Sequence, residues 1–258
     1  MGRVTAVIFD WAGTTVDHGS LAPVRTLQKL FAGHGMAFSE EEARRDMGVH
    51  KKDHIRALLR AKAGAAPDET EVDELFAAFI PMQMGCLAAY SMVIPGVPET
   101  VAELRARGIK IGSTTGYTRP MLDLLLATAA AQGYQPDCAL CPDDTIAGRP
   151  WPWMCYLNAI RLRTYPMHTM IKVGDTVSDI QEGLNAGMWT VGIARTGNEV
   201  GLTAEEFAAL PAAGQAARLE AAHGRLSEAG AHYVADAVAD CIPLVEQIEA
   251  LLAKGERP

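Results

Sequence analysis

Three polar residues, Asp10, Thr115 and Asp175, each directly follow a short run of apolar and β-branched residues. In an open parallel sheet the carboxyl ends of the strands meet at one edge, where ligands bind. We therefore expect these three side chains to form one site. Two carboxylates there would repel each other unless a cation lay between them, and hard oxygen ligands favour Mg²⁺. The alternative is that Asp10 and Asp175 cap the helices that follow them, as aspartate often does.

A lysine on an expected helix is a second candidate for chemistry. At ~100° per residue, Lys51 lies between Ile55 and Leu58 on an apolar face, whereas Lys52 lies on the solvated side. Burial on an apolar face lowers the pKa of a lysine, and the neutral amine can attack a carbonyl carbon. His54 lies three residues after Lys51, on a neighbouring edge of the same face. The alternative is a lysine whose stem packs on apolar neighbours while its ammonium group reaches water.

The elements that must position these residues alternate in type. Strands are expected at 4–9, 109–113, 138–141, 170–173 and 189–193, with a further one near 233–234, and helices lie between most of them. This alternation indicates βαβ units and a parallel sheet. Residues 22–90 carry almost only helical signals, among them a capping box from Ser39 to Glu42 and a helix break at 64–68. We expect an α/β fold: a doubly wound, Rossmann-like parallel-sheet core (residues 1–20 and 96–258) with an inserted all-helical cap domain (residues 21–95).

Composition excludes several classes of protein. The chain has 258 residues, of which 49% are hydrophobic, so it can bury a sizeable core. Its net charge of −8 disfavours a nucleic-acid partner. Five cysteines and a strand that begins almost at once predict a reduced, cytoplasmic protein. No segment is expected to reach the ~18 apolar residues of a membrane helix, so no membrane partner is predicted. Cys138 and Cys141 lack the further ligands of a zinc site and are interpreted as buried thiols, with zinc or redox use as the alternative.

The candidate residues stand in motifs that occur in a particular order. The sequence carries Val7-Ile-Phe-Asp10, then Ser113-Thr-Thr115-Gly116, then Val173-Gly-Asp175-Thr-Val-Ser-Asp179. In this order they resemble the motifs of the haloacid dehalogenase-like superfamily. That superfamily uses the first aspartate as a nucleophile, usually on phosphorus, together with Mg²⁺. The resemblance implies that Asp10 is the nucleophile and that Asp10 and Asp175 bind the metal.

The same resemblance implies roles for the residues around them. Thr115 and Gly116 would donate hydrogen bonds to a phosphoryl group. Arg149 matches the basic position of the third motif; the alternative is a surface arginine. Asp179 would support the metal site from behind its direct ligands, or would simply cap its own helix.

One position departs from the superfamily pattern. Phosphatases of this superfamily usually carry a second aspartate two residues after the nucleophile, as a general acid and base. Here that position is Ala12, which cannot give a proton to an alkoxide leaving group. Ordinary phosphate-ester hydrolysis is therefore disfavoured. The alternatives are a substrate whose leaving group needs no proton at oxygen, and a protein that has lost activity and only binds.

Further motifs narrow the resemblance to one family. The sequence carries Phe9-Asp10-Trp-Ala-Gly-Thr-Thr-Val-Asp17, Met47-Gly48 with Lys51 and Asp53-His54, Ile111-Gly-Ser-Thr-Thr-Gly-Tyr-Thr118, and Pro152-Trp-Met-Cys-Tyr156. Over the whole chain these motifs are similar to those of the phosphonoacetaldehyde hydrolases, or phosphonatases. That family cleaves the P–C bond of phosphonoacetaldehyde to acetaldehyde and phosphate, a step of phosphonate degradation. The other interpretation is an Mg²⁺-dependent phosphatase of the same superfamily that acts on a small phosphate ester.

The family resemblance also assigns individual residues. It implies that Lys51 forms a Schiff base with the aldehyde and that Asp10 forms an aspartyl phosphate. The backbone carbonyl of Ala12 would contribute to Mg²⁺ binding, and Met47 and His54 would lie at the substrate. His54 would move protons during imine formation; the alternative is a plain polar contact. The chemistry agrees, because an imine converts the carbanion that leaves phosphorus into an enamine. Members of the family are usually dimeric through the cap, so a homodimer is expected.

Overall fold

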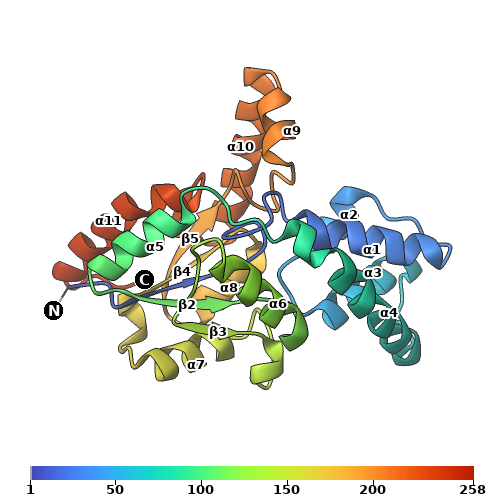
Figure 1. Ribbon diagram of the computed structural model, residues 1–258, viewed down its shortest axis with the longest axis horizontal. Coiled ribbons are helices and arrows are strands. Elements are labelled where there is room, and N and C mark those ends of the chain that lie inside the picture. The colour runs from blue at the N-terminus through green and yellow to red at the C-terminus, as the bar shows by residue number, and fades with distance from the viewer. Residues whose placement is uncertain (1) are drawn as a thin grey trace.

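The computed structural model describes residues 2–258, and its centre is a six-stranded sheet with every neighbouring pair parallel (Figure 1). The strands are β1 (Ala6–Phe9), β2 (Lys110–Thr114), β3 (Cys138–Leu140), β4 (Met170–Gly174), β5 (Trp189–Ile193) and β6 (Tyr233–Ala235), in the order β3-β2-β1-β4-β5-β6. The chain runs outward to β3 on one side of β1 and to β6 on the other. The order therefore reverses beside β1, which is where open α/β sheets bind ligands. The predicted α/β fold with a doubly wound sheet is confirmed.

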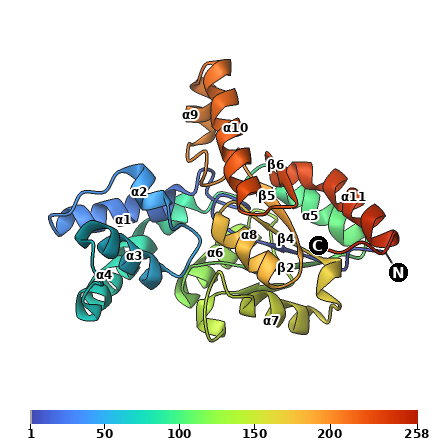
Figure 2. The ribbon, with the colours of Figure 1, turned by 180° about the vertical axis from the view of Figure 1, so that it is seen from behind.

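Helices cover both faces of this sheet, as the two opposite views show (Figures 1 and 2). One face carries α5 (Val97–Ala106), α6 (Arg119–Ala130) and α11 (Cys241–Ala253), and the other carries α7 (Trp153–Leu162) and α8 (Val177–Asn185). Successive side chains of β1 serve the two layers in turn, Val7 and Phe9 on one face and Ala6 and Ile8 on the other. A strand buried on both faces has no polar side, which explains the unbroken apolar run before Asp10.

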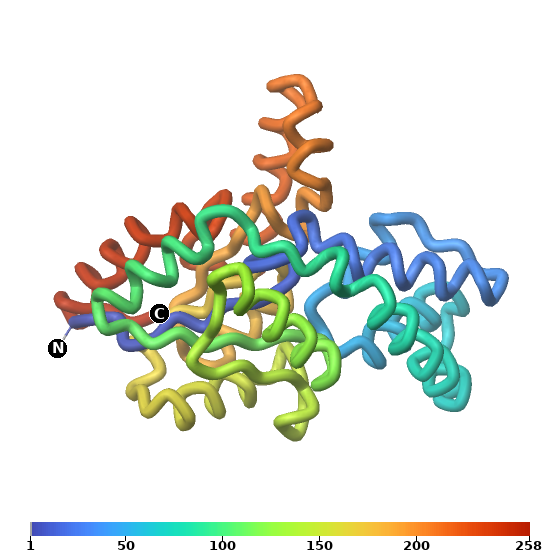
Figure 3. Tube along the Cα trace, in the orientation of Figure 1, coloured from blue at the N-terminus to red at the C-terminus, as the bar shows by residue number. Residues whose placement is uncertain are grey.

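Between β1 and α5 the chain forms four helices that lie together at one side of the sheet (Figure 3). They are α1 (Leu21–Gly33), α2 (Glu40–Arg44), α3 (Lys51–Ala63) and α4 (Glu69–Leu87). The predicted capping box is present, because Ser39 Oγ accepts from the Glu42 N–H at 3.1 Å and the Glu42 carboxylate accepts from the Ser39 N–H at 2.7 Å. The predicted break at 64–68 separates α3 from α4. We propose that these helices belong to a cap domain of residues 21–95.

The expectation that no segment is long and apolar enough to cross a membrane was wrong for α4 and the turn after it. Glu69–Tyr90 spans 22 residues with a mean hydropathy of 1.3 in its most apolar window, of which 28% is buried. Within the cap, α4 packs against α1 and α3 and buries Val72, Leu75 and Phe79. Length and hydropathy alone do not separate a membrane segment from a packed cap helix. The packing accounts for one face of α4 and leaves the other only partly covered.

The remaining elements connect the strands or extend from them. The helices α9 (Ala204–Ala209) and α10 (Ala212–Glu228) project away from the sheet between β5 and β6 (Figures 1 and 2). Only Ala222 and Leu226 of α10 are buried, which agrees with solvated helices in this stretch. Short 3₁₀ turns occur at Ala88–Tyr90, Pro142–Asp144, Met167–Thr169 and Val238–Asp240.

Candidate active site

The three predicted strand-end residues meet beyond the carboxyl edge of the central strands. β1 lies between β2 and β4, with Phe9 in register with both Ser113 and Val173. The chain therefore brings Asp10, Thr115 and Asp175 to neighbouring positions at one end of the sheet, as expected from parallel strands. All three are buried.

Three carboxylates form an acidic cluster at this edge. One oxygen each of Asp10, Asp175 and Asp179 lies within 4.8 Å of the other two. Burial raises the pKa of Asp175, and repulsion from Asp10 raises it further. In the part of the chain that the structure describes, Asp175 forms no ion pair: its oxygens accept from Thr14 Oγ1 at 3.0 Å and from the Asn198 N–H at 2.8 Å. A buried carboxylate without a cationic partner, beside two others, fits a divalent cation with hard oxygen ligands.

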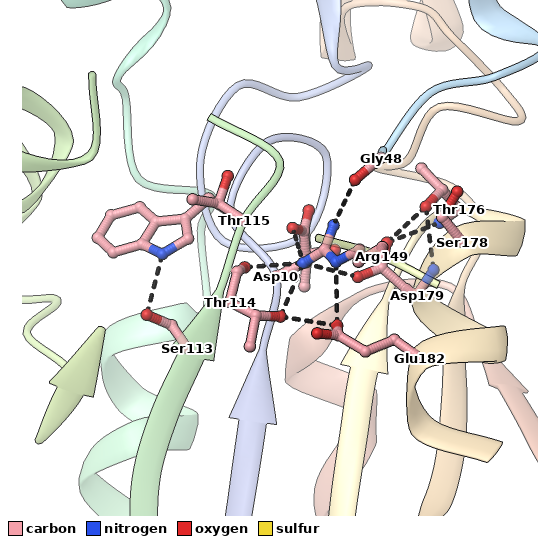
Figure 4. A network of polar contacts seen from close by, with 12 residues as sticks. Asp10, Gly48, Ser113, Thr114, Thr115, Arg149, Thr176, Ser178, Asp179 and Glu182 are labelled. Carbon is pink, nitrogen blue, oxygen red and sulfur yellow. Dashed lines mark hydrogen bonds and ion pairs between the residues drawn. The ribbon is translucent and has the colours of Figure 1, made fainter. Parts of the chain in front are cut away.

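Arg149 provides the central positive charge of the pocket (Figure 4). Its Nη2 lies 2.6 Å from Asp10 Oδ1 and 3.0 Å from Asp179 Oδ1, and its Nε donates to Glu182 Oε2 at 3.0 Å. Nη2 also donates to the carbonyl and hydroxyl oxygens of Thr114, each at 2.8 Å. The guanidinium group is fully buried, so Arg149 is not a surface arginine. Burial raises the pKa of Asp10, and the positive charge of Arg149 opposes that rise.

The loop that carries Arg149 differs from expectation. The stretch Ala147-Gly-Arg149-Pro150 follows the strand expected at 138–141, and the sequence pattern there predicts that the next helix opens at Ala147, whereas α7 begins at Trp153. Pro150 and Pro152 lack the backbone N–H and restrict the residue before each of them, which disfavours helix here. Residues 145–152 instead form bends and turns, from which Arg149 reaches Asp10 and Thr114.

Sequence reasoning missed two buried charges beneath Arg149. Glu182, on α8, accepts from Thr114 Oγ1 at 2.9 Å as well as from Arg149. Lys172, on β4, lies 2.6 Å from Asp179 Oδ1 and 3.6 Å from Glu182 Oε2. Burial opposes the ionisation of Asp179, but Arg149 and Lys172 outweigh it and lower its pKa. The sequence does contain one sign of these buried ion pairs, which is the lysine inside the apolar run Met-Ile-Lys-Val-Gly. A charge on a central strand is rarely left unpaired.

The cap contributes the amine predicted from helical spacing. Lys51 is 3% exposed and lines a small pocket together with Asp10, Ala12, Met47, Gly48, Thr115, Gly116, Tyr117 and Arg149. Its Nζ lies 3.4 Å from Met47 Sδ and 5.6 Å from the centre of the Tyr117 ring. Burial lowers the pKa of Lys51 to about 8. The other lysines of α3 differ, because Lys52 pairs with Asp73 and Lys62 is exposed.

His54 lies on α3 one turn from Lys51 and is completely buried. Neither of its ring nitrogens has a hydrogen-bond partner within residues 2–258. Burial lowers its pKa well below the usual value, so the imidazole is neutral. His54 is not among the residues that line the pocket.

The cap and the core touch closely at two glycines. A Cβ on Gly48, whose φ is +92°, would lie 2.3 Å from Thr176 Oγ1, and a Cβ on Gly116 would lie 2.5 Å from the Val49 carbonyl oxygen. The Ser178 hydroxyl donates to the Met47 carbonyl at 3.0 Å. The cap loop before Lys51 is therefore seated directly on the loops that follow β2 and β4. One pocket therefore combines the buried carboxylate of Asp10, the guanidinium group of Arg149 and the buried amine of Lys51.

The sequence is similar to a family model and to proteins of known name. The family model for haloacid dehalogenase-like hydrolases matches residues 4–187. A phosphonoacetaldehyde hydrolase of Nitratidesulfovibrio vulgaris is 47% identical over 266 residues, covering 100% of this chain and 95% of that protein. One from Bacillus cytotoxicus is 46% identical, covering 96% of this chain and 97% of the other.

Solved structures give the same picture. The crystal structure of a phosphonoacetaldehyde hydrolase-like protein from Oleispira antarctica matches with a TM-score of 0.95 and 42% identity, over 100% of this chain and 96% of that one. A β-phosphoglucomutase of Clostridium difficile matches with a TM-score of 0.74 and 14% identity, over 98% of this chain and 100% of the other. The second likeness concerns the fold alone.

The buried ion pairs under the pocket predict a specific stability effect. Lys172→Met leaves Asp179 and Glu182 with Arg149 as their remaining cationic partner, and loss of one member of a buried pair costs about 3–5 kcal/mol. We expect unfolding by denaturant to show a loss of about 3 kcal/mol, since Arg149 still compensates in part. The matched control is Lys52→Met, which breaks the more exposed pair with Asp73 and should lose at most about 1 kcal/mol. Equal losses in the two variants would contradict the assignment.

Proposed function

This chain belongs to the phosphonoacetaldehyde hydrolase family of the haloacid dehalogenase-like hydrolases, and we propose that it cleaves the P–C bond of phosphonoacetaldehyde to give acetaldehyde and phosphate. The observation that carries the proposal is that Lys51, a buried lysine of the cap, and Asp10 line the same pocket. A phosphatase needs no such amine. Names of relatives 46–47% identical over nearly the whole chain support the same substrate.

The first part of the proposed reaction takes place at Lys51. Its neutral amine attacks the aldehyde carbon, and with the uptake of one proton water leaves and a protonated imine forms. The Asp10 carboxylate then attacks phosphorus, and the P–C bond breaks with its electron pair moving into the imine to give an enamine. Protonation of the enamine at carbon and hydrolysis of the imine release acetaldehyde. The neutral imidazole of His54 is the candidate to move protons during imine formation.

The second part takes place at the acyl phosphate. Water hydrolyses the Asp10 aspartyl phosphate and regenerates the carboxylate. Thr115 and Gly116 lie in the pocket at the end of β2, where they can bind the phosphoryl oxygens, and Arg149 faces Asp10. Met47 contacts the Lys51 amine and lines the same pocket, which supports a place beside the carbon chain of the substrate.

The donor set also fits Mg²⁺. Asp10, the backbone carbonyl of Ala12 and Asp175 would hold the ion, and Asp179, paired with Arg149 and Lys172, would support them. Once bound, Mg²⁺ would offset negative charge on the phosphoryl oxygens and the attacking carboxylate.

Acetaldehyde release distinguishes this function from the other candidate. The second candidate is an Mg²⁺-dependent phosphatase that acts on a small phosphate ester, and Ala12 counts against it because no acid stands two residues after Asp10. We expect acetaldehyde and phosphate to appear in equal amounts from phosphonoacetaldehyde, with slower hydrolysis of simple phosphate esters. Ala12→Asp should not raise P–C cleavage, since it adds a carboxylate beside Asp10. Faster turnover of phosphate esters than of phosphonoacetaldehyde by the unmodified protein would favour the phosphatase.

The metal requirement can be measured separately from turnover. Asp175→Asn removes one of three clustered carboxylates, so calorimetry should show Mg²⁺ affinity reduced by more than the ~10–100-fold typical of losing an outer partner of a metal ligand. Chelation should abolish turnover and added Mg²⁺ should restore it. Full activity of a metal-free preparation would exclude this role.

The Lys51 amine should be trapped as a covalent adduct. Borohydride added with substrate should reduce the imine, and peptide mapping should locate it on Lys51. With a pKa of about 8, roughly one amine in ten is neutral at pH 7, against roughly one in 2,500 for an unperturbed lysine. Because the neutral amine reacts, the initial trapping rate should rise with pH through about 8 and then level off.

Two conservative variants provide the controls. Lys51→Arg keeps the charge but forms no imine, so trapping and turnover should be lost while the protein stays folded. Lys52→Arg should be trapped like the unmodified protein. An adduct mapped to Lys52 or Lys62 would move the imine to another residue. Turnover by Lys51→Arg would remove the imine from the reaction.

We propose further that the protein is a cytoplasmic homodimer formed through the cap. Phe76, Ile80 and Met84 recur every four residues on α4 and stay partly exposed, which supports a second copy as the cover of this face. Sedimentation velocity tests this proposal, and a monomer at micromolar concentration would contradict it.

A further inference from the structure

Arg44 ties the cap to the core although it lies outside the pocket. It is the last residue of α2, and its side chain is only 11% exposed. Its Nη1 donates to the Gly19 carbonyl at 2.9 Å and to Asn198 Oδ1 at 3.2 Å, and its Nη2 donates to the Gly201 carbonyl at 2.9 Å. All three acceptors belong to the core loops. A guanidinium group that binds three acceptors in fixed directions defines where the cap must sit.

Asn198 contacts both the cap and the acidic cluster. It lies in the loop after β5 and is 3% exposed. Its side-chain Nδ2 donates to the backbone carbonyl of Arg44 at 3.3 Å, so Asn198 and Arg44 bind each other twice. Its backbone N–H donates to Asp175 Oδ2 at 2.8 Å. One residue therefore joins the cap to a carboxylate of the acidic cluster.

The core loop is shaped to hold this contact. Gly201 has a φ of +68°, and a Cβ there would lie 2.6 Å from Arg44 Nε. A Cβ on Gly197 would lie 2.5 Å from Asp175 Cβ. The loop packs tightly against Arg44 at one end and against Asp175 at the other. A shift at one of these contacts is therefore expected to shift the other.

Arg44 is also close in sequence to the reacting amine. Arg44 and Lys51 are seven positions apart. The segment between them contains Met47 and Gly48, whose carbonyl groups accept from Ser178 and Arg149. A shift of Arg44 away from the core would carry this short segment, and the start of α3, with it.

We propose that the Arg44–Asn198 contact is a latch that couples closure of the cap over the pocket to the position of Asp175. Arg44 and Asn198 are positioning residues: neither lines the pocket, and both act through groups that do. When the latch forms, it brings the Lys51 amine of the cap and the Asp175 carboxylate of the core into position together. Without the latch, neither group is correctly placed. The inference rests on the proposed function, which gives Lys51 and Asp175 their tasks.

The test compares Arg44→Lys, Asn198→Ala and the double variant, without substrate. Reductive methylation with formaldehyde, mapped by mass spectrometry, measures access to Lys51, and calorimetry measures Mg²⁺ affinity. Both single variants should methylate Lys51 faster and bind Mg²⁺ more weakly, each on the order of 10-fold. Because the two residues act through one contact, the double variant should resemble the single ones rather than add their effects.

Arg56→Lys is the matched control. Like Arg44, which pairs with Glu40 on its own helix, Arg56 carries a paired guanidinium group on the cap, but within residues 2–258 its ion-pair partners, Asp53 and Glu69, are both cap residues. This variant should leave both measurements within twofold of the unmodified protein. Changes in Arg56→Lys as large as in Arg44→Lys, or additive effects in the double variant, would overturn the latch.

Hydrogen exchange tests the same coupling without any variant, should Arg44→Lys fail to fold. Mg²⁺ added to the unmodified protein should slow amide exchange in residues 40–50, which contribute no proposed metal ligand. Unchanged exchange at saturating Mg²⁺ would refute the latch. Failure of the unmodified protein to bind Mg²⁺ at all would instead refute the proposed metal site, so the two failures are distinguishable.

Discussion

The pocket depends on the buried guanidinium group of Arg149. Asp10, Asp179 and Glu182 would each be strongly destabilising as isolated buried charges, and each lies within ion-pair distance of this one group. The planar fork also has a fixed direction, because Glu182 holds Nε while Thr114 and Asp10 accept from Nη2. The same contact that makes the burial of Asp10 tolerable also opposes the rise that burial imposes on its pKa, and it fixes the direction of the carboxylate. The elements around it, β1, β2 and α8, can be seen as the frame that brings these partners to one point.

Chemistry is divided between two parts of the chain that are separated along the sequence. The core supplies carboxylates and a cation, which suit attack on phosphorus. The cap supplies an amine whose pKa is lowered because it is buried. The two groups could not exchange places. A lysine among the carboxylates would stay protonated, and a carboxylate against the apolar face of α3 would lack a cationic partner. Placing the two groups on different units and joining them at Gly48 and Gly116 resolves this conflict.

The residues predicted from the sequence are those whose placement follows from local rules. Asp10, Thr115 and Asp175 follow strands, and parallel strands bring such positions together whatever the details of packing. Lys51 follows from the helical period. By contrast Glu182, Lys172 and Asn198 matter through partners on other elements, and no periodicity relates the sequence positions of such partners. The membrane expectation for α4 was wrong for a different reason: the alanine, phenylalanine and methionine residues of this helix raise its mean hydropathy although acidic residues at its start shorten its apolar run.

The contact between Gly116 and the Val49 carbonyl has a consequence for how substrate range can diverge in this architecture. Gly48 and Gly116 line the pocket beside this contact without side chains, so the wall there is peptide backbone, and no replacement of one amino acid by another can make it thinner. Trimming Met47 would widen the pocket only on one side. A relative adapted to a longer aldehyde would have to reroute the chain before α3, so its divergence would be visible as insertions or deletions around positions 45–50. Alignment gaps there, more than altered side chains, would mark a change of substrate.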